Sequence, residues 1–315
     1  MKNINVLFQM DPLSQLTLEV DSTCKIAKEA LLRGHKAYFS EPKDIFYLVD
    51  KVLVNCSRLI LSETDSLNIV KSKNNLDLED FDVVFIRQDP PFNMNYISNT
   101  YIHDLHHSRS PFFINRPSGI RNFTEKLFPL AFNDLIPQTG ILGDQDEILN
   151  FVRTHKKVVI KPLYEKGGNG VSLVTSKDKD LLVKINRLTN NFSERIVVQE
   201  FLKNVSKGDK RVLLLDGEPV GAINRIPPKN QFKANLHLGA RAEKTKLSRA
   251  EEKICERLKP LLIENGLFFV GIDIIDEKLT EINVTSPTGI HLLNMLDKRK
   301  IETTMWKAIE DKIFF

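Results

Sequence analysis

The chain has 315 residues, of which 42% are hydrophobic and 27% charged, and these proportions exclude a protein that is disordered throughout. Its length predicts about two compact domains. A formal net charge of only +4 argues against a dedicated nucleic-acid binder. No apolar run approaches ~18 residues and no export signal is evident, so we expect a cytoplasmic protein that is not bound to a membrane.

The first third of the chain alternates short apolar runs with an amphipathic stretch. This alternation is typical of an α/β region built on an open parallel sheet. Residues 22–34 predict its first helix, with Ser22 as the cap and Gly34 at the end. The polar residues 62–80 predict a loop with little regular structure. The strands that we expect here are residues 4–8, 37–39, 81–87 and 112–115.

The other two thirds of the chain predict an α+β organisation with hairpins. One helix is expected near residues 144–155, and a capping box at Ser248 begins another that ends at Gly266. Asp216-Gly217 is a strong turn signal between two strands. The polar, lysine-rich residues 227–246 predict a surface loop. The strands that we expect here are residues 156–162, 171–175, a strand from 196, 211–215, 219–226, 268–275 and 279–284.

The sharpest set of candidate metal ligands lies in the last hairpin. Glu281 and Asn283 are two residues apart on a strand, so their side chains point to the same face. If residues 276–278 form a three-residue loop, Asp273 lies opposite Glu281 with the Cβ atoms ~5 Å apart. Such close carboxylates repel each other unless a cation intervenes, and an all-oxygen set suits Mg²⁺, with Mn²⁺ as an alternative. The competing interpretation is a polar hairpin that faces water.

Two lysines and a glycine-containing loop are candidates for binding phosphate. Lys161 ends an apolar strand, where an ammonium group is costly unless it meets an anion or water. The loop that follows contains Gly167 and Gly168, which let backbone N–H groups approach a phosphate. Lys126 lies near the start of a predicted helix. Each lysine alone is equally consistent with a side chain that extends along the surface into solvent.

Three further charged residues allow more than one interpretation. Asp209 and Arg211 precede a strand and are suited to hold a sugar and a phosphate. Arg87 ends a buried strand at a position where it could bind a carboxylate. Isolated charges of this kind are ordinary on protein surfaces, so none of the three decides the function alone.

No residue pattern indicates a covalent nucleophile. The sequence lacks Gly-x-Ser-x-Gly, and its three cysteines show no pairing with a histidine and no zinc or disulfide spacing. His103, His106 and His107 have helical spacing, which favours a solvated helix face over a metal site. We therefore expect no covalent intermediate on the protein.

Several of these stretches together resemble the bacterial glutathione synthetases of the ATP-grasp superfamily. The resemblance runs from Met10 nearly to the C-terminus, and residues 269–288 are its most specific part. Other matching stretches are residues 87–92, 115–117, 122–128, 160–163, 208–212, 216–219 and 225–227. The resemblance implies an ATP-grasp fold with an N-terminal parallel-sheet domain at 1–122, a central subdomain at 123–202, and a C-terminal subdomain at 203–315 that carries a lid loop at 227–246.

The resemblance also implies roles for individual residues. ATP would lie between two antiparallel sheets, and two Mg²⁺ ions would be held by Asp273, Glu281 and Asn283. The implied ATP contacts are Lys126, Lys161, Gly167 and Gly168 near the phosphates, Gln199, Glu200, Phe201 and Leu202 at the adenine, Asp209 at the ribose and Arg211 at the transferred phosphate. The implied catalytic residues are Arg211, Lys233 and Arg241, and the implied substrate contacts are Arg87, Arg225, Ser286, Pro287 and Thr288.

The implied reaction joins γ-glutamylcysteine to glycine. ATP would phosphorylate the cysteinyl carboxylate, and the glycine amine would then attack the acyl phosphate, with cations stabilising the developing charge. The family also implies a homotetramer. Two alternatives stay open because the expected lid keeps only Gly239 where glycines are usual, and Lys233 replaces a usual arginine. They are another ATP-grasp carboxylate–amine ligase with a different acceptor, and a non-catalytic descendant.

Overall fold

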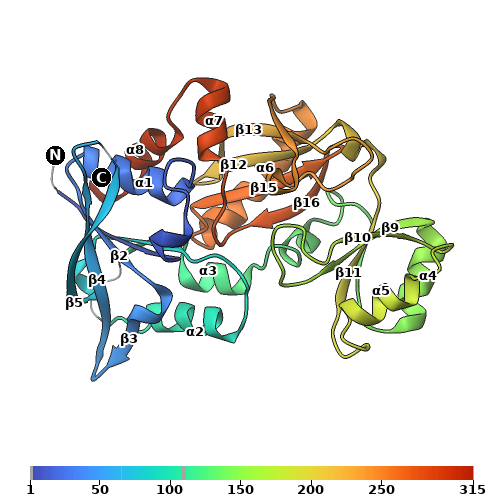
Figure 1. Ribbon diagram of the computed structural model, residues 1–315, viewed down its shortest axis with the longest axis horizontal. Helices are drawn as coiled ribbons and strands as arrows, with labels where there is room; N and C mark the ends of the chain where they lie inside the picture. Colours follow the sequence, from blue (N-terminus) through green and yellow to red (C-terminus); the bar gives the residue numbers. More distant parts are fainter. Residues whose placement is uncertain (1–2, 65, 108–110, 315) are drawn as a thin grey trace.

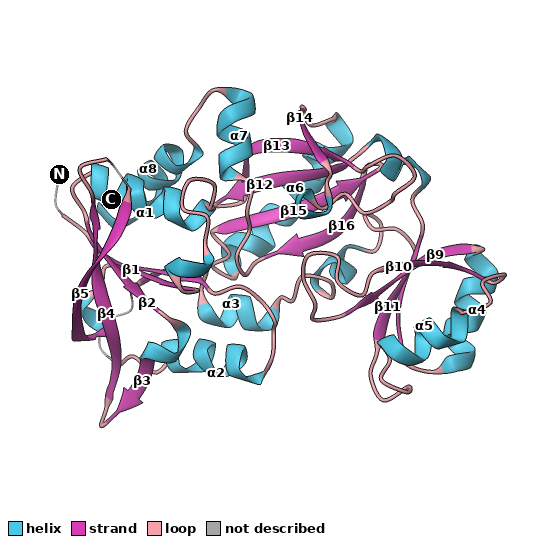
Figure 2. Cartoon of the chain, viewed as in Figure 1, coloured by secondary structure: helices cyan, strands magenta, loops and turns pink. Residues whose placement is uncertain are grey.

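The computed structural model describes residues 3–64, 66–107 and 111–314. Three sheets follow one another along the chain, and Figure 1 shows the C-terminal sheet lying between the N-terminal and the central ones. Figure 2 shows helices packed against each of the three sheets. Within the described ranges, no helix combines the length and apolarity needed to cross a bilayer.

The N-terminal sheet contains the expected parallel core, with strand order β2-β1-β6-β7. Its strands are β1 (Asn5–Met10), β2 (Lys36–Ser40), β6 (Val83–Arg87) and β7 (Phe112–Ile114). Helix α1 (Ser22–Leu32) is capped by Asp21, which accepts a hydrogen bond from the N–H of Cys24. The cap therefore lies one residue before Ser22, the residue that the sequence suggested. Helices α2 (Met94–His103) and α3 (Pro117–Asn122) follow.

The expectation of an irregular loop at residues 62–80 is wrong. Most of this segment is β5 (Leu67–Asp77), which pairs with β4 (Lys51–Leu61) in a long antiparallel hairpin. Leu67 and Ile69 pack against the core of the N-terminal domain. Most other residues of β5 are polar, so the sequence shows no clear alternation of polar and apolar residues. Their low strand propensity is offset by pairing with β4. Strand β4 also pairs with β2 and with β3 (Ile45–Leu48), which makes the sheet mixed.

The central sheet is antiparallel, with strand order β10-β9-β11-β8. Val158 and Ile160 of β9 pack against helix α4, whereas Val159 and Lys161 point the other way, toward the cavity described below. The alternation of the strand thus fixes the direction of Lys161. The elements are β8 (Thr139–Leu142), α4 (Gln145–His155), β9 (Lys157–Pro162), β10 (Ser172–Thr175), α5 (Leu181–Leu188) and β11 (Ile196–Glu200).

The C-terminal sheet is also antiparallel, with strand order β14-β13-β12-β15-β16. Val212 and Leu214 of β12 pack with helix α6, so Arg211, one residue earlier, points to the opposite face. The expected capping box of Ser248 and Glu251 begins α6. The elements are β12 (Asp209–Leu215), β13 (Glu218–Ile226), β14 (Arg241–Lys244), α6 (Arg249–Glu264), β15 (Phe269–Ile275) and β16 (Lys278–Asn283).

The last two helices connect the end of the chain to its beginning. Helices α7 (Ile290–Asp297) and α8 (Ile301–Phe314) pack on α1. The buried Trp306 donates a hydrogen bond to the carbonyl of Ile26 at 2.8 Å, and its ring lies 5.8 Å from that of Phe85. Each sheet lies within one of the three expected segments, but α8 shares its core with the N-terminal sheet.

Candidate active site

A cavity of about 500 Å³ lies between the central and the C-terminal sheets. Its size is typical of a site for a small molecule. Both sheets are antiparallel, as expected for an ATP site of this architecture. The cavity lining includes most of the predicted site residues, namely Lys126, Lys161, Gly167, Gly168, Gln199, Glu200, Phe201, Leu202, Asp209, Arg211, Arg225, Lys233, Asp273, Glu281, Asn283, Ser286, Pro287 and Thr288.

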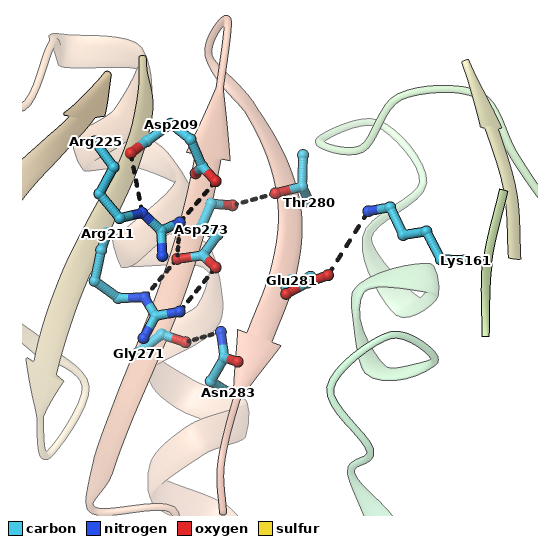
Figure 3. Close-up of polar contacts among 9 residues, drawn as sticks. All are labelled: Lys161, Asp209, Arg211, Arg225, Gly271, Asp273, Thr280, Glu281 and Asn283. Carbon is cyan, nitrogen blue, oxygen red and sulfur yellow. Dashed lines mark hydrogen bonds and ion pairs between the residues drawn. The ribbon is translucent and has the colours of Figure 1, made fainter. Parts of the chain in front are cut away.

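The C-terminal wall of the cavity carries a network of two arginines and two aspartates (Figure 3). Arg211 lies opposite Asp273 in the β12–β15 pairing and donates to both of its carboxylate oxygens, at 2.5 and 2.9 Å. Arg225 donates to Asp273 at 3.0 Å and to Asp209 at 2.7 Å. Asp209 lies opposite Arg225 in the β12–β13 pairing, so strand register alone brings the four side chains together.

Burial and these ion pairs act in opposite directions on the two aspartates. Burial alone would raise the pKa of Asp273, but Arg211 and Arg225 outweigh it and hold that pKa well below its usual range. Burial raises the pKa of Asp209 to about 6, because Arg225 only partly offsets it and the negative charge of Asp273 adds to it. One oxygen of Asp209, Oδ1, is buried and has no hydrogen-bond partner among the described residues. A ligand hydroxyl group would satisfy it.

The hairpin of β15 and β16 has the predicted pairing, with Asp273 opposite Glu281. The connection differs from the expected three-residue loop. It is a two-residue turn, Asp276-Glu277, with left-handed φ angles of 54° and 59°, and a bulge beyond Asp273 restores the register. The Nδ2 of Asn283 donates to the carbonyl of Gly271 at 3.2 Å, and both Asn283 and Glu281 line the cavity.

Lys161 and Glu281 reach toward each other across the cavity, as Figure 3 shows. The Nζ of Lys161 lies 3.7 Å from Oε1 of Glu281, and the two side chains are only 12% and 25% exposed. The anion that a lysine at the end of an apolar strand requires is therefore the carboxylate of the opposite sheet. A negatively charged phosphate between the sheets would meet the same ammonium group.

Lys126 holds the base of the glycine-containing loop. Its Nζ donates to the carbonyls of Leu163 at 3.3 Å and Glu165 at 2.6 Å, and the residue is buried. The expected helix around Lys126 is absent, and the residue lies in a turn between α3 and a 3₁₀ helix at Phe128–Phe132. The backbone explains the difference, because the carbonyl of Glu125 accepts a hydrogen bond from the N–H of Ile282 in β16.

The loop expected at residues 227–246, the predicted lid, is shorter than the sequence suggested, because residues 241–244 form β14 and pair with β13. The irregular part, residues 227–240, lies against the glycine-containing loop, where Lys233 donates to the carbonyl of Gly168 at 2.9 Å. The Arg241 side chain is 74% exposed and pairs with Glu243 at 2.5 Å. It lies outside the cavity lining, so the structure does not bring Arg241 together with the other predicted catalytic residues.

Arg87 lies behind the cavity rather than in its lining. It is 3% exposed, and it donates to Oγ1 of Thr23 at 3.0 Å and to the carbonyl of Pro287 at 2.9 Å. Ser286, Pro287 and Thr288 line the cavity themselves. The contact that Arg87 makes is therefore with the loop that carries these predicted substrate-binding residues.

Sequence reasoning missed Glu125, which lies in the cavity beside Glu281. Its Oε1 accepts a hydrogen bond from Oγ1 of Thr285 at 3.0 Å. Burial, followed by the negative charge of Glu281, raises the pKa of Glu125. The only signal in the sequence is that this acidic residue directly precedes Lys126, a candidate phosphate ligand.

The predicted solvated face of histidines is wrong for His103. This side chain is fully buried, its Nε2 lies 3.2 Å from Oε1 of Gln9, and burial lowers its pKa to about 3. His106 stacks on Phe113, whereas His107 is exposed. Within residues 3–64, 66–107 and 111–314, no three His, Cys, Asp or Glu side chains converge as a metal site.

Comparison with known proteins agrees with this geometry. The model of the prokaryotic glutathione synthetase N-terminal domain matches residues 4–121, and that of the prokaryotic glutathione synthetase ATP-grasp domain matches residues 125–298. The chain belongs to the prokaryotic glutathione synthetase family. The glutathione synthetase of Mesorhizobium japonicum is 39% identical over 310 residues, which cover 98% of this chain and 99% of the relative. That of Agrobacterium fabrum is 39% identical over 309 residues, covering 98% and 97%.

The fold agrees with more distant ATP-grasp proteins as well. The crystal structure of D-cycloserine synthetase DcsG superimposes with a TM-score of 0.67 at 13% identity, covering 98% of this chain and 99% of that one. Membership of the glutathione synthetase family makes this chain an ATP-dependent ligase that forms glutathione. Ligases with an ATP-grasp domain use ATP and a divalent metal ion.

The residues present fit a divalent metal ion that is shared with phosphate. Glu281 and Asn283 offer oxygen atoms side by side on β16, and hard cations prefer such ligands. Asp273 is adjacent, but both of its carboxylate oxygens accept hydrogen bonds from Arg211. With so few free protein oxygens, an ion here would complete its coordination with water and the phosphates of a nucleotide.

Proposed function

We propose that the cavity joins γ-L-glutamyl-L-cysteine to glycine with ATP bound between the two sheets. The observation that carries this proposal is the ion pair between Lys161 of the central sheet and Glu281 of the C-terminal sheet, which meet across the cavity. The Arg211–Asp273 pair lies on the C-terminal sheet beside Glu281. Cations and oxygen ligands thus face one another across a space sized for a small molecule. The buried Oδ1 of Asp209, which has no hydrogen-bond partner among the described residues, could accept a hydrogen bond from a ribose hydroxyl group. The apolar side chains of Phe201 and Leu202 suit an adenine ring.

The first step transfers the γ-phosphoryl group of ATP to the cysteinyl carboxylate of the dipeptide. A carboxylate oxygen attacks phosphorus and the bond to the β-phosphate oxygen breaks, giving an acyl phosphate and ADP. Arg211 and Lys161 lie where their charges would stabilise the phosphoryl oxygens. Mg²⁺ or Mn²⁺ held by Glu281 and Asn283, next to Asp273, would neutralise phosphate charge.

The second step is the attack of the glycine amine on the acyl phosphate. The carbonyl oxygen becomes an oxyanion, phosphate leaves as the oxyanion collapses, and the amine passes its proton to the departing phosphate as the peptide bond forms. Lys233 of the lid is the cation assigned to this step, and the closed lid excludes water that would hydrolyse the acyl phosphate. Ser286 and Thr288 are assigned to the substrates, and Arg87 orients their loop through the carbonyl of Pro287.

The remaining assignments are less direct. Arg225 is engaged with Asp209 and Asp273, so we assign it to holding the wall rather than to touching the dipeptide. Arg241 would need to move with the lid to reach a substrate, since its side chain is exposed. A homotetramer stays a prediction, which sedimentation of the purified protein tests.

An assay of ADP release tests the proposed function. The enzyme is given ATP, Mg²⁺ and γ-glutamylcysteine with glycine, alanine, serine or no acceptor. Fast release with glycine alone supports glutathione formation. Faster release with alanine or serine than with glycine would contradict the proposal that this cavity selects glycine. Absence of release with every acceptor would contradict the assignment of the reaction to this cavity.

A further inference from the structure

The lid carries an aromatic side chain into the cavity. Phe232 lines the cavity beside the lid residue Lys233, whose ammonium group is fixed on the carbonyl of Gly168. The ring of Phe232 meets that of Phe201 edge to face, with 6.4 Å between centroids and 79° between planes. Ala234, two residues later, is 4% exposed. This part of the lid is thus packed as an inner surface.

The cavity lining holds further apolar side chains besides the two rings. Leu202 follows Phe201 directly in the chain, and Val205 lies a little further on. Along β9, Val159 comes two residues before Lys161 on the same face, and along β15, Ile275 comes two residues beyond Asp273 toward the turn. The loop at residues 285–288 follows β16, so along the β15–β16 hairpin it lies at the opposite end from Ile275, with Asp273 and Glu281 between them.

We propose that Phe232 and Phe201 together bind the purine ring of ATP, so that the lid closes on the nucleobase and is ordered by nucleotide alone. This inference rests on the proposed function, because it requires ATP to lie between the two sheets. It adds a residue of the lid to the nucleotide site and gives two adjacent lid residues different tasks. Phe232 recognises the base, and Lys233 responds to the anionic centre.

The physical reason lies in the chemistry of the two rings. A phenyl ring offers an apolar face and a weakly positive edge, which suit a flat conjugated base and offer nothing to a phosphate or a carboxylate. Removal of a stacking ring by alanine substitution weakens binding of a base roughly 5- to 150-fold. We expect loss of Phe232, one of two rings, to weaken nucleotide binding about tenfold, near the lower end of that range.

Calorimetric titration separates the base from the phosphates. Phe232→Ala is compared with wild-type protein in binding a non-hydrolysable ATP analogue and in binding inorganic tripolyphosphate, both with Mg²⁺. We expect about tenfold weaker binding of the analogue and unchanged binding of tripolyphosphate. Phe232→Tyr, which keeps the ring, should restore the affinity. Leu238→Ala is the matched control, because Leu238 is an apolar lid residue outside the cavity lining.

Limited proteolysis tests the ordering of the lid. The analogue without dipeptide should slow tryptic cleavage after Lys229 and Arg241 in the wild type and in Leu238→Ala, but not in Phe232→Ala. Equal affinity of wild type and Phe232→Ala for the analogue would overturn the inference, as would an equal loss of tripolyphosphate binding. A wild-type protein that binds no analogue would instead contradict the proposed function itself.

Discussion

The two walls of the cavity hold their charged groups in different ways. On the C-terminal wall, Arg211 and Asp273 pair on neighbouring strands, with side chains only 11% and 6% exposed, and neutralise each other before any ligand arrives. On the central wall, Lys126 is bound to the carbonyls of a loop, and Lys161 reaches across the cavity to Glu281. The first kind of charge is fixed by pairing within one sheet, whereas Lys161 depends on a partner from the other sheet, which a ligand between the sheets can replace.

The largest effect is expected from breaking the C-terminal wall. Asp273→Ala leaves the guanidinium group of Arg211 without a carboxylate and Arg225 with Asp209 alone, so the free energy of unfolding should fall by roughly 3–5 kcal/mol and activity should be lost. Chemical denaturation measures the first effect. The control is Asp134→Ala, which removes an exposed pair with Arg257 and should cause no measurable change. Equal stability of the two variants would contradict the structural role of this wall.

Glu281 belongs to the C-terminal wall and faces Lys161 on the central wall, so it should matter for the reaction and little for the fold. Glu281→Gln removes a proposed metal ligand and is expected to lower kcat roughly a hundredfold, with an unfolding midpoint close to that of the wild type. Turnover measured over a range of Mg²⁺ concentrations checks the prediction. The control is Glu252→Gln, which replaces an exposed carboxylate on α6 by a carboxamide and should behave as the wild type. Wild-type turnover of Glu281→Gln at low Mg²⁺ would remove Glu281 from the metal site.

A smaller effect is expected from the pH dependence of Asp209. Because its folded pKa is raised to about 6, the ionised carboxylate is complete only above that value and is lost as the pH falls through it. A protonated Asp209 holds Arg225 and the proposed ribose hydroxyl less well, so the KM for ATP should rise below about pH 6. Steady-state kinetics across this range provide the measurement. The KM of Asp209→Asn, which has no carboxyl group here, should not follow the same rise.

The smallest effect is expected from the thiols. Cys24, Cys56 and Cys255 are buried, and burial raises their pKa values to about 12, 11 and 12. None lines the cavity, and a thiol with such a pKa carries almost no thiolate at neutral pH. Each Cys→Ser variant should therefore keep nearly full turnover. Inactivation of a variant that circular dichroism shows to be folded would mean that a thiol takes part in the reaction.

The sequence by itself determined the strands and side-chain directions of the site. Alternation places Glu281 and Asn283 on one face, and it sends Lys161 away from the buried Val158 and Ile160. These relations depend on a period of two residues, which any strand imposes. The resemblance to glutathione synthetases also rests on short sequence motifs, and the match to the family models confirms it.

Only the tertiary structure decided which partners these side chains meet. Arg211 and Arg225, which form ion pairs with Asp273, come from strands about 50 to 60 residues earlier in the chain. The strand at Leu67–Asp77 depends on pairing with β4, and the burial of His103 depends on packing against the N-terminal sheet. In each case the deciding contact is between segments distant in sequence. Local periodicity describes which way a side chain points, but the burial and charge it meets there are set by elements that fold against it.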